Sequence, residues 1–238
     1  LIDPQTHATV GAGMIIDRVP AGALAPQAAD WHEGDDESRE GQGLPERVGA
    51  DERAEHLGHR PATVWLTGLP ACGGTEIAYA LERLLAKRRV LSYVLGGREL
   101  RTTLSHDLDH SARDTSEHLR RVSAVARILN QAGTLAICSF VSPTLAVRAR
   151  VRETLKDDLI VVHVASPLEW CESRDPRSVY ARARAGELLN VAGVNAPYEH
   201  PESPELVLRP DQTGIEAAAE AIVSLLEARG LLSADGGQ

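Results

Sequence analysis

The residues from Gly68 to Thr75 could do phosphate chemistry. A strand-like run, Thr63 to Thr67, precedes them, and a helix-patterned run, Ile77 to Arg88, follows them. In a strand, turn and helix of this kind, backbone N–H groups and the N-terminus of the helix bind phosphates. Gly68, Gly73 and Thr75 take the glycine and hydroxyl positions of the phosphate-loop pattern G-x-x-x-x-G-K-[ST]. The predicted nucleotide-binding residues are therefore Gly68, Leu69, Pro70, Ala71, Cys72, Gly73, Gly74 and Thr75, with Thr75 also a candidate Mg²⁺ ligand.

The lysine of this pattern is missing. Gly74 stands in its place, so the turn has no side chain that neutralises a bound phosphate. A tight turn without a ligand is the alternative interpretation. Glu76 favours that alternative, because a carboxylate in the first helical turn is stabilised by the same dipole and free N–H groups that a phosphate would use.

Composition excludes several classes of protein. The 238 residues carry a net charge of −9, and only 3% are aromatic, which is typical of neither a nucleic-acid-binding surface nor a base-stacking platform. We find no apolar run long enough to span a bilayer and no secretory signal at the start. Three widely spaced cysteines fit neither a disulfide framework nor a zinc site. The sequence predicts a cytoplasmic protein without nucleic-acid or membrane partners.

Composition also predicts four segments. Residues 1–18 contain β-branched and glycine residues that suit the last strands of a preceding domain, and the chain begins with Leu1 rather than Met, as a piece of a longer product would. Residues 19–60 are rich in Ala, Gly, Pro and acidic residues, with Trp31 and Leu44 as the large apolar exceptions, and predict a flexible acidic linker. Residues 61–232 predict one folded domain, and residues 233–238 a disordered tail.

Within residues 61–232, short apolar runs alternate with amphipathic helical segments. We expect strands at 63–67, 90–95, 134–140, 159–165 and 206–208 and helices at 77–88, 115–131, 146–155, 179–187 and 215–229, with a further short helix opening at Pro167. This alternation predicts an α/β fold of three layers, with a parallel five-stranded sheet between helices. A ligand would then bind at the carboxyl ends of the strands, beside Gly68.

Several further motifs carry a resemblance to a known family. They are Val64-Trp65-Leu66-Thr67-Gly68-Leu69, Phe140-Val141-Ser142-Pro143, Asp175-Pro176, Ala183-Arg184-Ala185-Gly186-Glu187 and Pro197-Tyr198-Glu199. Together with the spacing between Arg101 and Arg121, they make residues 61–232 resemble the adenylyl-sulfate (APS) kinase family. The opening residues, Leu1 to Ile15, are similar to the end of the GTP-binding large subunit of sulfate adenylyltransferase.

The resemblance implies a P-loop kinase fold and a function in sulfate activation. The family transfers the γ-phosphate of ATP to APS with Mg²⁺ as cofactor, which makes APS or an adenine nucleotide the implied ligand. It also implies a homodimer, and a link through the attached GTPase subunit to the small subunit of sulfate adenylyltransferase. The implied substrate-binding residues are Arg98, Arg101, Ser142 and Pro143, and Ser142 is also a candidate catalytic residue because some members carry a phosphoserine there.

The chain departs from the family pattern at catalytic positions. Besides the lysine replaced by Gly74, the family's Asp-Gly-Asp-Asn is Gly96-Gly97-Arg98-Glu99, an asparagine is His118, and the lysine and phenylalanine of the lid are Leu189 and Val191. Losing one preorganised cationic donor costs roughly 10²–10³ in rate, and losing a general base costs roughly 10²–10⁴. The residues therefore predict an impaired kinase that acts as a ligand-binding or regulatory module.

Two alternatives remain open. One is an active kinase in which Arg98 replaces the lysine, and the other is a domain that serves only dimerisation or assembly. Individual residues also allow structural roles: Arg101 could instead pair with Asp107, and Arg148 could lie on a solvated helix face. We expect His118 to be a surface residue.

Overall fold

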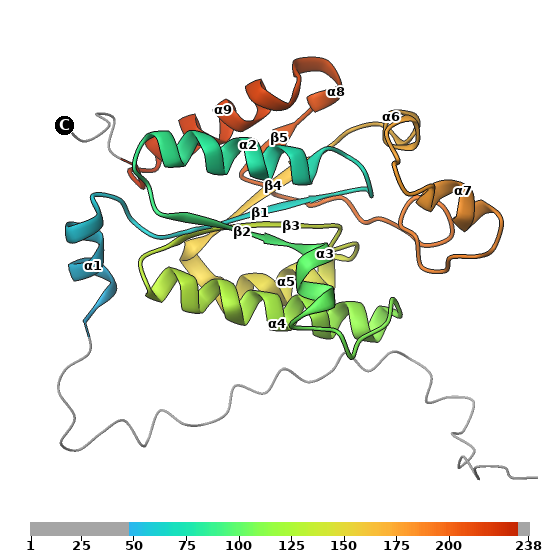
Figure 1. The fold of residues 1–238 in the computed structure, drawn as a ribbon, viewed down its shortest axis with the longest axis horizontal. Coiled ribbons are helices and arrows are strands. Elements are labelled where there is room, and N and C mark those ends of the chain that lie inside the picture. The colour runs from blue at the N-terminus through green and yellow to red at the C-terminus, as the bar shows by residue number, and fades with distance from the viewer. Residues whose placement is uncertain (1–47, 233–238) are drawn as a thin grey trace, which may run out of the picture.

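The computed structural model describes residues 48–232, which form one parallel sheet between two layers of helices (Figure 1). The strands are β1 (Thr63–Gly68), β2 (Ser92–Gly96), β3 (Leu135–Phe140), β4 (Leu159–Val164) and β5 (Leu206–Leu208), and their order across the sheet is β2-β3-β1-β4-β5. Every pairing between neighbouring strands is parallel. The predicted three-layer α/β fold with five parallel strands is confirmed.

The helices cover both faces of this sheet. Helices α2 (Gly74–Lys87) and α9 (Ile215–Ala228) lie on one face, and α4 (Ala112–Gln131) and α5 (Leu145–Leu155) lie on the other (Figure 1). Shorter helices are α1 (Ala50–Leu57), α3 (Gly97–Thr102), α6 (Leu168–Ser173), α7 (Val179–Arg184), α8 (Pro210–Thr213) and the 3₁₀ turn η2 (Lys156–Asp158). Among the described helices, none combines the length and the apolar content that crossing a membrane requires.

Burial follows the periodicity of each element. All six residues of β1 and all six of β4 are buried, as expected for central strands covered on both faces. On α2, the buried side chains include Ile77, Leu81 and Leu85, which recur along one face of the helix. At the start of α4, the Ser111 hydroxyl accepts a hydrogen bond from the Asp114 amide and caps the helix. These patterns determine which face of each helix packs on the sheet, and so where the loop between β1 and α2 lies.

The structure differs from the predicted segments at one boundary. Residues 50–57 form α1, where the sequence predicts the end of the linker. Gly58 closes α1 in the left-handed conformation, with a φ of 70°, and Leu57 packs beside Gly133. The expectations for residues 1–18 and 19–47, and that for the tail at 233–238, lie outside the described residues and stay predictions.

Strand β2 forms one edge of the sheet, and its outer side is partly covered by a side chain. The Glu82 carboxylate on α2 accepts a hydrogen bond of 3.0 Å from the backbone N–H of Val94. The Tyr93 side chain on the same strand is 49% exposed. The edge therefore has an apolar, accessible surface and one amide that is already paired.

Candidate active site

The loop from Gly68 to Gly73 connects β1 to α2 and surrounds a hollow. The hollow has a volume of about 120 Å³ and is lined by Leu66–Glu76 together with Ser139, Phe140 and Val141. Ala71 and Gly73 both have positive φ angles, of 57° and 94°, which turn the chain back into the helix. The Ile77 amide then donates to the Gly73 carbonyl, at 2.9 Å. All eight predicted nucleotide-binding residues line this one hollow.

Neighbouring elements hold the loop in place. A Cβ atom on Gly68 would lie 2.5 Å from the Val164 carbonyl oxygen, so only glycine fits where β1 ends beside β4. The Ser166 hydroxyl donates to the Cys72 carbonyl at 3.0 Å, and the Tyr180 hydroxyl donates to the Pro70 carbonyl at 2.7 Å. Burial raises the pKa of the Cys72 thiol to about 12, so this cysteine stays protonated at neutral pH.

Gly74 is buried at the start of α2 and faces β3. A Cβ atom at this position would lie 3.0 Å from the Ser139 hydroxyl. Ser139 is in register with Gly96 at the end of β2, two residues before Arg98. The Arg98 side chain is exposed and has neither a hydrogen bond nor an ion pair within residues 48–232. The backbone of Arg98 therefore lies near Gly74, where the lysine is missing. No hydrogen bond or ion pair within residues 48–232 holds its side chain away from that position.

Ser142 is part of a buried hydrogen-bond network. Its hydroxyl accepts a hydrogen bond from Trp65 Nε1 at 3.1 Å and donates to Thr67 Oγ1 at 2.8 Å, and the residue is 1% exposed. Thr67 donates in turn to the Val141 carbonyl at 2.7 Å, with the Tyr198 hydroxyl 3.0 Å from its oxygen. In this conformation Ser142 organises the end of β3 and is not accessible for nucleophilic chemistry.

Arg148 lies beneath this network, and the expectation of a solvated helix face is wrong for it. The side chain is buried, and it donates to the carbonyl oxygens of Ser142 and Glu199. The Pro143 carbonyl accepts a hydrogen bond from the Glu199 amide at 2.9 Å, so these contacts join the loop after β3 to residues near Tyr198. Arg148 therefore positions the wall of the site without facing the hollow.

A second cluster lies where α3 meets α4. Arg101 donates to the Asp109 carbonyl at 2.7 Å, while Asp107 pairs with Arg121, so the alternative of an Arg101–Asp107 pair is wrong. His118 is 2% exposed, which corrects the expectation of a surface residue. Its Nδ1 lies 2.9 Å from the Ser105 hydroxyl, and its Nε2 is buried without a partner.

The surroundings of His118 keep its ring neutral. Burial, followed by the nearby charges of Arg101, His110 and Arg121, lowers its pKa to about 4. The ring also contacts Phe140 edge-on, with 5.5 Å between the ring centroids. Phe140 in turn lies beside Gly97, where a Cβ atom would come within 3.3 Å of the ring. His118, Phe140 and the start of α3 thus form one wall beside the loop hollow.

Sequence reasoning missed His163 on β4. This residue is 7% exposed, and its ring stacks on Tyr198 with 6.0 Å between the centroids and meets His200 at 5.3 Å. Burial, then the charges of His200 and Arg148, lower its pKa to about 4. A polar residue near the carboxyl end of an otherwise apolar strand was the available signal.

The described residues do not fit a Mg²⁺ ion held by protein carboxylates. No group of three or more His, Cys, Asp or Glu side chains within residues 48–232 could hold a metal. Thr75 offers a hydroxyl at the start of α2, but Gly96 and Arg98 stand where carboxylates would be needed. Mg²⁺ prefers one or two carboxylates together with substrate phosphates.

The sheet order, the loop between β1 and α2, and the hollow at the carboxyl ends of the strands define a P-loop kinase fold. Residues 60–209 match the family model described as adenylylsulphate kinase, which is more than half of the chain. The chain therefore belongs to the adenylyl-sulfate kinase family.

This chain is similar both to kinases of about the domain's own length and to longer bifunctional enzymes. An adenylyl-sulfate kinase of Staphylococcus carnosus is 39% identical over 181 residues, which cover 76% of this chain and 91% of the relative. A bifunctional enzyme CysN/CysC of Rhodopirellula baltica is 42% identical over 233 residues, which cover 98% of this chain and 35% of that protein. This chain thus spans about a third of the longer relative.

The structure of the Mycobacterium tuberculosis APS kinase CysC in complex with AMPPNP and APS superimposes with a TM-score of 0.68. It is 40% identical in sequence, and the superposition covers 71% of this chain and 99% of that one. The family predicted from the sequence motifs is confirmed, and its reaction uses ATP and APS, typically with Mg²⁺. None of these comparisons tests the role of an individual residue at the site.

Proposed function

We propose that this domain binds APS and an adenine nucleotide at the carboxyl ends of its strands, and that it transfers phosphate slowly. The observation that supports slow transfer is the N-terminus of α2, where Gly74 replaces the lysine and Glu76 adds a carboxylate to the first turn. The loop has the glycines that its tight turn needs: a Cβ on Gly68 would lie 2.5 Å from the Val164 carbonyl oxygen, and Gly73 has a φ of 94°. In this proposal, the domain still binds APS and the nucleotide, although it transfers phosphate slowly.

A working kinase is the second candidate, and the relatives favour it over impairment. The S. carnosus relative, 39% identical, is named an adenylyl-sulfate kinase without qualification. Arg98 would be the substitute for the lysine, since it lies two residues beyond the strand position that pairs with Ser139, and its side chain is exposed. A guanidinium is a strong phosphate ligand, so this substitution is chemically sound.

One coupled assay for PAPS formation separates these candidates. We expect turnover at least about 10²-fold below that of a standalone family member. The triple variant Gly74→Lys, Gly96→Asp and Arg98→Asp should recover much of this deficit. Gly74→Lys requires the Ser139 hydroxyl to move by a few tenths of an ångström, whereas a Cβ at Gly96 meets no atom within 4 Å. Gly74→Ala is the matched control, because it adds the same Cβ without the charge.

The opposite results are equally informative. Parental turnover within about tenfold of an ordinary member would contradict slow transfer, and a large loss in Arg98→Ala would then establish the working kinase. Calorimetry with APS, PAPS and ADP tests binding separately. If none of the three ligands gives heat, the proposal fails and an assembly domain remains.

We further propose that the domain works as part of a larger sulfate-activating protein in the cytoplasm. The match to the R. baltica bifunctional enzyme, which includes residues before α1, supports an attached GTPase subunit of sulfate adenylyltransferase. Through that subunit the domain would meet the small subunit, and it would itself form homodimers. Light scattering of the purified chain tests the homodimer, which a monomer would contradict. Light scattering of the chain joined to the GTPase subunit, with and without the small subunit, tests the second association, which an unchanged mass would contradict.

A further inference from the structure

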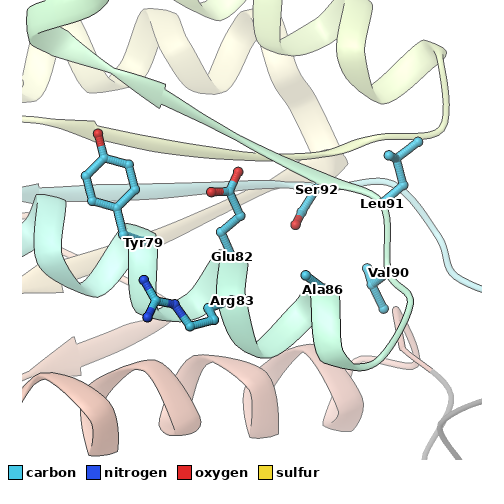
Figure 2. Close-up of a pocket in the computed structure, with 7 residues that line it drawn as sticks. All are labelled: Tyr79, Glu82, Arg83, Ala86, Val90, Leu91 and Ser92. Carbon is cyan, nitrogen blue, oxygen red and sulfur yellow. The ribbon is translucent and has the colours of Figure 1, made fainter.

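A groove lies between α2 and β2, on the side of the domain away from the phosphate loop. Its volume is about 560 Å³, and it is lined by Tyr79, Glu82, Arg83, Ala86, Val90, Leu91 and Ser92 (Figure 2). Tyr79 and Leu91 are 52% and 49% exposed. Figure 2 shows Tyr79 and Glu82 extending from α2 toward β2. This α2–β2 groove therefore presents an aromatic and an aliphatic side chain to solvent.

Three cations flank the α2–β2 groove, and the one carboxylate in its lining, that of Glu82, accepts a hydrogen bond from the Val94 amide. Tyr79, Arg83 and Lys87 recur every four residues and so share one face of α2, and Arg89 is the second residue after the helix. The side chains of Arg83, Lys87 and Arg89 are exposed and have no ion pair or hydrogen bond within residues 48–232. By contrast, Arg88 pairs with Glu227 on α9. Three unpaired cations beside an apolar groove suit a partner that is acidic and carries a large apolar side chain.

The chain itself contains such a partner. Residues 30–40 hold six acidic residues against Arg39, a net charge of −5, and they include Trp31. We propose that residues 30–40 of the same chain dock in the α2–β2 groove, with Trp31 against its apolar side chains and the carboxylates near Arg83, Lys87 and Arg89. This proposal is independent of the kinase chemistry.

Chain connectivity permits this contact. Residues 41–47 join the acidic segment to Val48, and the 17 peptide units between Trp31 and Val48 reach at most about 60 Å. The described chain begins at the same end of the domain as the groove: Leu57 of α1 lies beside Gly133, and the Leu135 amide, two residues on, donates to the Leu91 carbonyl. A tethered segment has an effective concentration of about millimolar, so weak contacts suffice.

The chain is well suited to a zero-length cross-linking test, because Lys87 and Lys156 are its only lysines. A carbodiimide joins a lysine amine to a carboxylate in direct contact. In the full chain, we expect peptide mass spectrometry to find Lys87 joined to residues 30–40 at least about fivefold more often than Lys156 is. Lys156 is the internal control, since it is exposed and lies in η2, away from the groove. Raising the salt to about 0.5 M should reduce the Lys87 product severalfold.

Two groove variants and one matched control complete the experiment. Arg83→Glu and Tyr79→Ser should each reduce the Lys87 product at least about threefold. Arg127→Glu makes the same charge change at an exposed position of α4, on the other face of the sheet. This control should leave the amount of the Lys87 product unchanged. A mixture of ¹⁴N- and ¹⁵N-labelled chains distinguishes contacts within one chain from contacts between copies. Equal labelling of both lysines, no effect of the groove variants, or mixed-isotope products would overturn the proposal.

Discussion

Acidification from pH 7 to pH 5 should destabilise this domain through two buried histidines, His118 and His163. Both have an ordinary pKa of 6.5, which burial lowers to about 4 in the folded state. The unfolded chain therefore takes up protons at a higher pH than the folded chain does. The stability that the neutral rings contribute is complete above about pH 6.5 and is lost as the pH falls toward about 4.

The size of the effect follows from these values. Between the two pKa values, each histidine lowers the free energy of unfolding by about 1.4 kcal/mol per pH unit. From pH 7 to pH 5 this amounts to about 2 kcal/mol per histidine and about 4 kcal/mol for both. Pairing with Arg121 lowers the pKa of Asp107 to about 2, so this carboxylate stays ionised over the whole range.

Urea unfolding at steps of half a pH unit from pH 7.5 to pH 5 measures how steeply the free energy of unfolding changes with pH. The variant His118→Asn with His163→Phe removes two of the rings whose pKa burial lowers and should make the slope of the free energy of unfolding against pH much shallower; His110, whose pKa burial also lowers, accounts for a remaining part. His106→Asn replaces an exposed histidine of the loop after α3 and serves as the control. A double variant that loses stability with pH as steeply as the parent would refute the reasoning, as would a parent whose free energy of unfolding is the same at pH 7 and pH 5.

Two further predictions concern packing near the loop. Ser142→Ala should lower the free energy of unfolding by about 1–3 kcal/mol, because it removes the acceptor of the buried Trp65 N–H, and urea denaturation measures it; a loss of activity without loss of stability would instead indicate a catalytic role. Gly68→Ala should cost at least about 2 kcal/mol, since its Cβ would meet the Val164 carbonyl at 2.5 Å, whereas Gly96→Ala has open space and should lose far less. Equal melting temperatures for the two glycine variants would contradict this account.

Much of the fold could be predicted because its signals are local. The run at 159–165 consists almost entirely of apolar residues and predicted the buried strand β4, which ends one residue earlier. Similarly, the apolar spacing of residues 77–88 predicted α2, although the helix begins at Gly74, within the loop itself. The helix start was missed because Gly74 and Thr75 have little helix propensity, and tertiary packing decides the conformation.

The environment of single side chains could not be predicted in the same way. Arg148 and His118 are polar residues on helices, which usually face water. Each is buried because its partners come from distant segments: the Glu199 carbonyl for Arg148, and the Ser105 hydroxyl for His118. Helix α1 was missed for a related reason, since Leu57 finds its contact beside Gly133, far along the sequence.

The hydrogen bond between Glu82 and the Val94 amide affects how copies of this domain can meet. An uncovered outer strand offers a template on which another chain can extend the sheet, a route to fibres. Here, an incoming strand would have to displace a carboxylate and leave it facing backbone oxygen atoms, which repel it. The β2 edge is thereby protected at Val94 against extension of the sheet by another chain.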